Sequence, residues 1–317
     1  MPGISLVVCV YKERNLVERL LRETAGCYDD LVVVHDGPED ESPEERTQKP
    51  EAIDYFALVA DGRLPAGYRV PDGRPRPESI RALVHEHSGR YFEGPRSFQQ
   101  EPHWPFAWSQ AKYDWILRLD ADEFPSVELK SWLQSFRSEK ESPACSGFTC
   151  IWPLWNGRKA VTRRWPEGRN FLFHRRRVRF FGMVEQVPIP DASFKEVELV
   201  LHHQPKRKSY GIHNSVVRRQ GFDWRRVIAQ SLMGKPTDLP CWRWTSENWP
   251  DQWERVRQHP LRHSLSTLIR YPLQQMRGML SVGERPILSA CLSPGLYHGL
   301  LGLRVFVEMR RKGTAAP

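Results

Sequence analysis

Several familiar sequence signals are missing from this chain of 317 residues. Its 6 cysteines form no Cys-x-x-Cys pair, and scattered free thiols of this kind fit a reducing compartment. No internal repeat is visible. Two glycine-rich phosphate motifs, GxxxxGK[ST] and GxGxxG, are absent, so any bound phosphate would be held by a metal ion and arginine. The first residues lead directly into an apolar run without a signal-peptide pattern, so we expect a cytoplasmic protein.

Lysine is scarce among the basic residues, at 11 of 47, which leaves 36 arginines. Arginine recognises phosphate through a planar, bidentate fork, although a GC-rich genome would also enrich it. The charge is uneven: residues 206–317 hold 19 basic and 7 acidic residues, whereas residues 1–205 hold 28 and 31. We therefore expect two regions with different tasks, a near-neutral region 1–205 and a basic region 206–317.

The first forty residues have the pattern of a strand, a helix and a second strand. Ile4–Val10 is a continuous apolar, β-branched run, which is typical of a strand buried on both faces. Leu16, Leu20 and Leu21 follow at helical spacing, and Asp29–Gly37 is a second buried run. This order predicts a βαβ unit and hence a parallel sheet.

A polar insertion, 39–77, follows, with a helix expected around Ala52–Val59. We predict a third strand at Ala82–His87 and a fourth at Trp115–Leu119, which runs directly into an acidic cluster. The sequence therefore predicts an α/β fold for the first region.

Carboxylates stand at the ends of two predicted strands. Asp36 ends the second, and Asp120, Asp122 and Glu123 follow the fourth. Ligands bind beyond the carboxyl ends of strands in open α/β sheets. Asp-x-Asp suits a hard divalent ion, Mn²⁺ or Mg²⁺, that keeps open positions for a diphosphate. The alternative is an ordinary helix N-cap at Asp122 or Ser126.

Further candidate residues lie later in the first region. Glu185 is a lone acid in the apolar run FFGMVEQVPIP, where partial burial would raise its pKa towards that of a useful base; an exposed Glu on a strand face is the alternative. His202 and His203 follow an apolar run and point to opposite faces by strand alternation, so one of them could bind a metal.

Two further features carry an open alternative. Arg175–Arg179 is either a solvated charge run or a receptor for a phosphorylated acceptor. Five tryptophans flank the predicted site and could line a sugar-binding groove, although most are expected in the core: Trp104, Trp108, Trp152, Trp155 and Trp165.

The basic region ends in two apolar helical segments. The first begins at Leu261 and carries Arg262, Arg270 and Arg277, with Pro272 expected to kink or split it. The second, Ile287–Leu303, is almost long enough to span a bilayer, but its proline, histidine and glycines argue against spanning. The pair either lies on an anionic membrane surface or packs on the catalytic domain.

The runs VVCVYKE, VVVHDGPED and WILRLDADE, in this order and spacing, resemble the family 2 glycosyltransferases, which have the GT-A fold. The resemblance covers about residues 1–205 and is strongest to the branch that builds bacterial surface glycans such as the lipopolysaccharide core. It implies a Rossmann-like, mostly parallel sheet flanked by helices, here with a C-terminal helical extension.

The same resemblance assigns roles to individual residues. Tyr11 and Glu13 would lie near the nucleotide, Asp36 would accept from the base, usually uracil, and Arg96 would lie near the nucleotide. Asp120 and Asp122 match the metal–diphosphate motif, Glu185 matches the catalytic base, and His202 matches a later metal ligand. Val184 stands where the family usually has His.

The sequence is therefore identified as an inverting, metal-dependent glycosyltransferase. It would move a sugar from a nucleotide-diphosphate donor, with UDP the family default, to a glycan or lipid-linked acceptor at the cytoplasmic face of the membrane. Two other classes compete with it. A nucleic-acid-binding protein would explain the arginines, but no binding motif for RNA or DNA is visible. An inactive GT-A-like binding module is opposed by the intact Asp-x-Asp.

Overall fold

The computed structural model describes residues 2–41, 67–97, 100–180, 187–211, 229, 232–233 and 251–314. The helix expected around Ala52–Val59 and the proposed base Glu185 lie outside these residues. The chain forms two compact units. The first takes its described residues from the stretches up to 153 and 168–205, and the second from 154–167 and from 206 onward. The assignment of separate tasks to the two regions stays a prediction.

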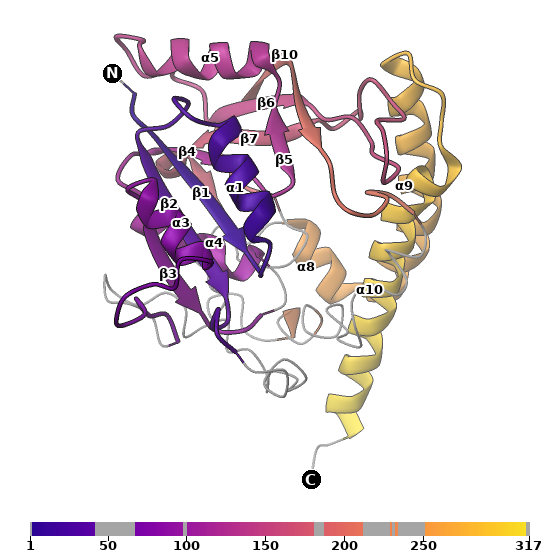
Figure 1. Ribbon diagram of the computed structural model, residues 1–317. Helices are drawn as coiled ribbons and strands as arrows, with labels where there is room; N and C mark the ends of the chain where they lie inside the picture. Colours follow the sequence, from indigo (N-terminus) through magenta and orange to yellow (C-terminus); the bar gives the residue numbers. More distant parts are fainter. Residues whose placement is uncertain are drawn as a thin grey trace. The chain divides into compact units, whose positions relative to one another are not determined.

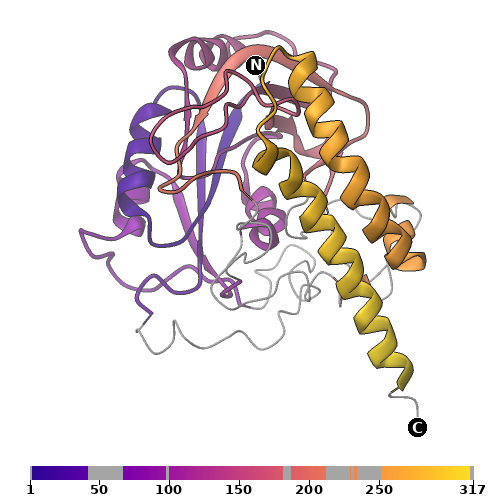
Figure 2. The same cartoon turned by 90° about the vertical axis from the view of Figure 1, so that its right-hand side faces the viewer.

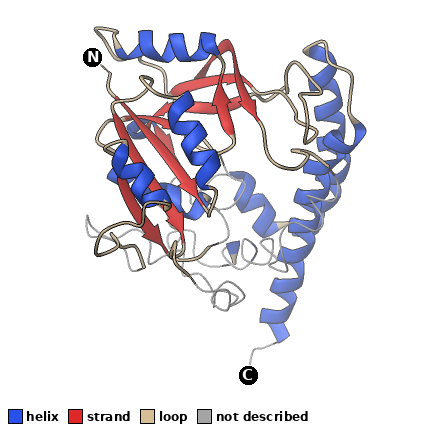
Figure 3. Cartoon of the chain, viewed as in Figure 1, coloured by secondary structure: helices blue, strands red, loops and turns tan. Residues whose placement is uncertain are grey.

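The first unit is built on an eight-stranded sheet with the order β3-β2-β1-β4-β7-β6-β10-β5 (Figures 1 and 3). The neighbours β3, β2, β1 and β4 are parallel, as are β6 and β10, whereas β7 and β5 run antiparallel to their neighbours. The expected α/β fold with a mostly parallel sheet is confirmed. Its strands are β1 (Ile4–Val10), β2 (Asp30–Asp36), β3 (Arg90–Gly94), β4 (Trp115–Arg118), β5 (Glu123–Pro125), β6 (Gly147–Ile151), β7 (Arg169–His174) and β10 (Phe194–His203).

The predicted βαβ unit is present. All seven residues of β1 are buried, as its unbroken apolar run predicts for a strand covered on both faces. Helix α1 (Arg14–Glu23) buries Val17, Leu20 and Leu21 on one face and returns the chain to β2. The other helices of this unit are α3 (Ile80–Glu86), α4 (Trp104–Gln110) and α5 (Val127–Arg137). A short pair, β8 (Val178–Arg179) and β9 (Ile189–Pro190), lies outside the main sheet.

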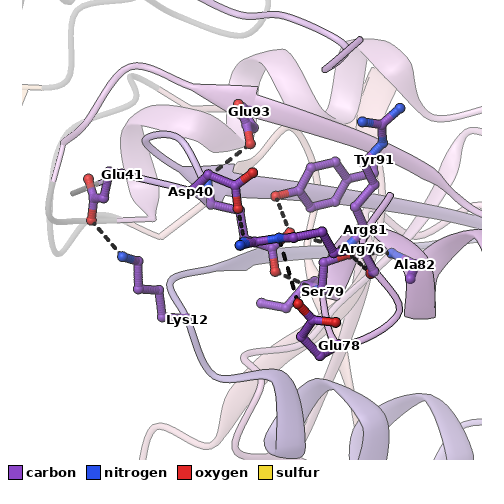
Figure 4. A network of polar contacts seen from close by, with 12 residues as sticks. Lys12, Asp40, Glu41, Arg76, Glu78, Ser79, Arg81, Ala82, Tyr91 and Glu93 are labelled. Atoms are coloured by element: carbon purple, nitrogen blue, oxygen red, sulfur yellow. Dashed lines mark hydrogen bonds and ion pairs between the residues drawn. The ribbon is translucent and has the colours of Figure 1, made fainter. Parts of the chain in front are cut away.

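The strand predicted at Ala82–His87 is wrong, because this segment forms helix α3 and the third strand follows it. Helix capping decides the outcome. The Ser79 hydroxyl accepts a hydrogen bond from the backbone N–H of Ala82 at 3.0 Å (Figure 4). The Glu39 carboxylate accepts from the N–H groups of the first two helical residues. The apolar residues Ile80, Leu83 and Val84 have helical spacing and are buried.

The arginine run Arg175–Arg179 has a structural role. The Arg175 and Arg176 guanidinium groups lie 2.8 and 3.0 Å from the two carboxylate oxygens of Asp114. Arg177 donates to the backbone oxygen of Cys145 at 3.0 Å. These contacts fix the turn after β7, a role that neither of the two alternatives for this run anticipated, and they occupy the Arg175 and Arg177 guanidinium groups.

The second unit contains helices α8 (Asp251–Gln258), α9 (Pro260–Ser281) and α10 (Leu288–Thr314), of which α9 and α10 lie side by side along most of their length (Figures 1 and 2). Helix α9 runs through Pro272 as one element, so the proline does not split it. Within the described residues, one helical stretch, Leu288–Arg311, is long and apolar enough to cross a bilayer, judged by length and composition alone.

Glycines let α10 approach α9 closely. A Cβ atom at Gly302 would lie 2.7 Å from the backbone oxygen of Pro260, and one at Gly299 would lie 2.7 Å from the Leu268 side chain. The Ser264 hydroxyl uses this proximity and donates to the backbone oxygen of Gly299 at 2.6 Å. The glycines that argued against a spanning helix therefore serve helix–helix packing.

Candidate functional site

The direction of the strands brings distant segments to one edge of the sheet. β1, β2, β3 and β4 all end there, and the chain order reverses at β1, which lies between β2 and β4. Such a reversal is where ligands bind in open α/β sheets. Because β7 is antiparallel to β4, its first residue, Arg169, reaches the same edge, and so does His203 at the end of β10.

Asp36, at the end of β2, lies in a buried polar cluster. Its carboxylate accepts from His103 Nε2 at 3.0 Å and from the backbone N–H and hydroxyl of Ser97. Burial alone would raise the pKa of Asp36, but the contacts with His103 and Ser97 and the charge of Arg96 outweigh it, so the pKa is lowered. This ionised carboxylate fixes the segment that carries Arg96.

Tyr11 and Arg96, which the sequence placed near the nucleotide, are brought together. The Arg96 guanidinium lies 4.5 Å from the centre of the Tyr11 ring. Both side chains bind Glu41: the Tyr11 hydroxyl donates to it at 2.8 Å, and Arg96 forms an ion pair with it. Lys12 Nζ lies 3.2 Å from the same carboxylate (Figure 4). Despite burial, these donors lower the pKa of Glu41.

The turn after β1 is held by the backbone of Lys12. This residue has a φ of 51°, a left-handed conformation that is uncommon outside glycine. Its N–H donates to His35 Nε2 at 3.1 Å, while His35 Nδ1 bonds the backbone oxygen of Gly37. Glu13 follows as the first residue outside α1 and makes no side-chain capping bond. Its role near the nucleotide stays a prediction.

A second cluster follows β4 and is built on opposite charges. Arg169 Nη2 lies 2.9 Å from Asp120 Oδ2, and Arg169 Nε lies 2.8 Å from the fully buried carboxylate of Glu123. Burial would raise the pKa of Asp120, but Arg169, Arg118 and His203 together lower it. Burial raises the pKa of Glu123 and outweighs the opposing charge of Arg169. Of these two carboxylates, Asp120 is therefore the one that stays ionised more readily.

Arg118, the last residue of β4, is a second buried cation beside this cluster. Its guanidinium lies 4.3 Å from the centre of the Trp104 ring and donates to the backbone oxygen of Asn170 at 3.1 Å. Burial, reinforced by the charge of Arg169, lowers the pKa of Arg118 to about 9. Trp104 packs here on the aromatic core, as expected for most of the tryptophans.

The histidine beside Asp-x-Asp is His203 rather than His202. His203 Nε2 lies 3.5 Å from Asp122 Oδ1, and the imidazole stacks on Trp152 with ring centres 4.5 Å apart. His202 occupies the opposite face of β10, where Arg19 and Glu128 act on it electrostatically. Strand alternation separates the two rings, so the placement of His202 next to the acidic motif is corrected to His203.

The donors around Asp-x-Asp suit a hard divalent ion in type. Among the described residues no three His, Cys, Asp or Glu side chains are arranged as a finished metal site. Within the part of the chain that the structure describes, Asp120 Oδ1 and His203 Nδ1 of this cluster are nevertheless buried without a hydrogen-bond partner. A buried carboxylate oxygen without a donor is costly unless a cation satisfies it. In donor type, Asp120, Asp122 and His203 therefore fit Mn²⁺ or Mg²⁺.

Sequence reasoning missed three residues of the site, Glu41, His103 and Arg169, and it favoured His202 over His203. Glu41 stands in the acidic stretch PEDES, where nothing distinguishes it from its neighbours. Arg169 carried one usable signal, an Arg two positions before the apolar run FLF. The residues that these side chains contact lie 30 to 67 positions away in the sequence. The contacts therefore become visible only once the chain is folded.

Comparisons with known proteins add little at this level of similarity. No family profile and no curated protein matches the sequence. Among solved structures, the mannosyltransferase PcManGT from Pyrobaculum calidifontis, in complex with GDP-Man and Mn²⁺, has a TM-score of 0.40 at 14% identity, covering 100% of this chain and 76% of its own. TarS 1-349 from S. aureus has a TM-score of 0.33 at 9% identity, covering 98% and 92%. Scores this low carry no argument about function.

Proposed function

We propose that this protein is a metal-dependent glycosyltransferase that uses a nucleotide-diphosphate sugar. The observation that carries the proposal is the convergence of two polar clusters at the reversal point of the sheet. One cluster presents Tyr11 and Arg96, and the other presents Asp120 and Asp122. A stacking surface for a base next to a carboxylate pair for a metal–diphosphate is the arrangement that a nucleotide sugar needs.

The donor would lie with its base and ribose at the first cluster. The flat Tyr11–Arg96 pair offers a surface for stacking, and Glu41 holds both side chains in place. Asp36 already binds His103 and Ser97, so its contribution includes fixing the Arg96 segment as well as the predicted contact with the base. UDP as the nucleotide belongs to this proposal.

The diphosphate would lie at the second cluster. Asp120, Asp122 and His203 would hold Mn²⁺ or Mg²⁺, which when bound stabilises negative charge on the leaving diphosphate. The contact of Arg169 with Asp120 Oδ2 keeps the carboxylate ionised and in position. Trp152 fixes the imidazole of His203 by stacking and donates to Glu123 at 3.1 Å.

The membrane side of the proposal rests on the second unit. Residues from Leu261 onward would hold the enzyme at the cytoplasmic face, next to a glycan or lipid-linked acceptor in surface polysaccharide or lipopolysaccharide synthesis. The basic charge of residues 206–317 and the exposed apolar residues of α9 support it.

Nucleotide diphosphates should stabilise the protein only together with a divalent ion. At a hundredfold excess over Kd, a ligand that binds the folded state adds about 2.7 kcal/mol. In a chain of this size, that corresponds to a rise in Tm of about 4 °C. The measurement is a thermal-shift screen of UDP, GDP, ADP and CDP with Mn²⁺, with Mg²⁺ and with EDTA. An equal shift in EDTA, or a shift with oligonucleotides alone, would contradict the proposal.

Glu185→Gln should lower turnover at least a hundredfold and leave the affinity for the nucleotide nearly unchanged. Glu185 would take the proton from the acceptor hydroxyl as it attacks opposite the diphosphate, which inverts the anomeric centre. The measurement is nucleotide diphosphate release with a saturating donor, together with the Kd for the nucleotide. Glu196→Gln, an exposed Glu on β10, is the matched control. Near-normal turnover in Glu185→Gln would remove Glu185 from the mechanism.

A further inference from the structure

The second unit contains a cavity that the proposed transfer reaction does not use. It has a volume of about 520 Å³ and lies among α8, α9 and α10. A cavity of this size is in the usual range for small-molecule sites. Its lining is Trp253, Arg255, Val256, His259, Arg262, His263, Ser266, Arg270, Tyr271 and His298.

The part of the lining that the structure describes is positively charged and contains no acidic residue. Arg255 and Arg262 form no ion pair, and Arg270 contacts only the ring of Tyr271, at 5.7 Å, among the residues that the structure describes. These three arginines are exposed, and they gather positive charge around one cavity with no counterion among the described residues. An anion with several oxygens, such as a phosphate monoester or diphosphate, would balance this charge through charge-assisted hydrogen bonds.

Buried polar atoms also lack partners at this cavity. Trp253 Nε1, a hydrogen-bond donor, and His263 Nε2 are both buried without a hydrogen-bond partner. Burial, together with the charge of His263, lowers the pKa of His298 to about 4, so the His298 ring is neutral at pH 7. The positive charge of the cavity therefore comes from arginine, and the rings supply hydrogen bonds. A polar ligand or a water molecule in the cavity would satisfy both atoms.

Helix α9, which supplies half of the described lining, also exposes an apolar stripe. Leu265 and Ile269 of α9 are 66% and 68% exposed, and the stripe also includes Leu261, Leu268 and Leu273 at helical spacing. Apolar side chains beside a cationic site match a ligand with a charged head and an apolar tail. A lipid with a terminal phosphate has this chemistry, whereas a soluble phosphate would leave the stripe uncovered.

We propose that the cavity lined by Arg255, Arg262 and Arg270 binds the phosphate of a membrane lipid, with the exposed leucines of α9 at the level of the acyl chains. The proposal rests on the membrane association proposed above and is independent of sugar transfer. It adds a lipid class, phosphomonoester or diphosphate, and the residues that recognise it.

The test is flotation of the full-length protein with two kinds of vesicle matched in surface charge. One kind contains phosphatidic acid, a phosphomonoester, and the other contains phosphatidylglycerol, a phosphodiester. We expect about tenfold tighter binding to phosphatidic acid, because three arginines can saturate a terminal phosphate. The double variant R262A/R270A should lose this preference. The control R277A/R285A removes two exposed arginines of the same unit that do not line the cavity. It should bind both vesicles more weakly but keep the ratio.

Each other outcome contradicts a defined part of the proposal. A ratio near one in the wild type, or a ratio retained in R262A/R270A, overturns the cavity as the recognition site. No binding to either vesicle overturns the membrane association. In a parallel thermal-shift arm, glycerol 3-phosphate should raise Tm less than a short-chain phosphatidate does, because it cannot cover the apolar stripe. An equal rise would overturn the lipid as the source of the phosphate. Retained melting of R262A/R270A shows that the variant is folded.

Discussion

Arg169→Met is expected to lower the free energy of unfolding of the sheet unit by about 3–5 kcal/mol, the usual cost of removing one partner from a buried ion pair. Arg169 contacts two carboxylates at once, and the fully buried Glu123 has no water to replace it. Methionine has a similar length and leaves no large cavity, so the loss reports on charge. Urea denaturation followed by tryptophan fluorescence measures it.

A surface arginine provides the comparison for Arg169→Met. Arg14 pairs with Glu18 at 2.8 Å one turn away on α1, and both side chains are partly exposed. Arg14→Met should therefore cost less than about 1 kcal/mol. If Arg169→Met costs no more than Arg14→Met, the carboxylates of Asp120 and Glu123 are protonated or solvated, and the charge balance described for this cluster is wrong.

Asp122→Ala is expected to abolish metal-dependent nucleotide binding and to lower transfer activity at least a hundredfold. A hard divalent ion needs its oxygen ligands, and the loss of one of two carboxylates leaves too few protein donors. Asp122 also holds His203 through a 3.5 Å contact, so the substitution releases a second candidate ligand. Titration of tryptophan fluorescence with the nucleotide in Mn²⁺ measures the loss.

Asp72→Ala is the matched control for Asp122→Ala, since Asp72 is exposed and lies apart from both polar clusters. It should keep the affinity and the metal dependence of the wild type. If Asp122→Ala binds nucleotide as tightly as Asp72→Ala and with the same dependence on Mn²⁺, then Asp122 is not a metal ligand. An ordinary helix-capping role would then account for the acidic motif.

Much of the parallel sheet was predictable because its strands are buried on both faces. Ile4–Val10 and Trp115–Leu119 read as strands without any knowledge of their neighbours, and β1 begins and ends at the predicted residues. The carboxylates at the strand ends followed from the same pattern. Ala82–His87 was misread because its caps, Ser79 and Glu39, decide for a helix, and Glu39 lies 41 positions upstream of the helix it caps.

The finer geometry of the site depended on contacts that no local pattern records. His202 and His203 differ only in which face of β10 they occupy, and a shift of one residue exchanges them. Arg169 reaches Asp120 only because β7 runs antiparallel to β4. The sequence predicts parallel strands and gives no sign of this antiparallel pairing. Glu41 binds Tyr11 and Arg96 across a loop whose path is set by tertiary contacts.

The close packing of α10 on α9 restricts how the second unit could meet a bilayer. A Cβ atom at Gly302 would lie 2.7 Å from the backbone oxygen of Pro260, so this side of α10 is covered by α9. The two helices would therefore move together. Moving α10 into the hydrocarbon layer would therefore also carry Arg262, Arg270 and Arg277 of α9 into it. Burying each of these arginines near the midplane costs about 2.5–3.5 kcal/mol. The two helices are better suited to lie together at headgroup depth, where those arginines meet phosphate and water and the leucines alone are immersed.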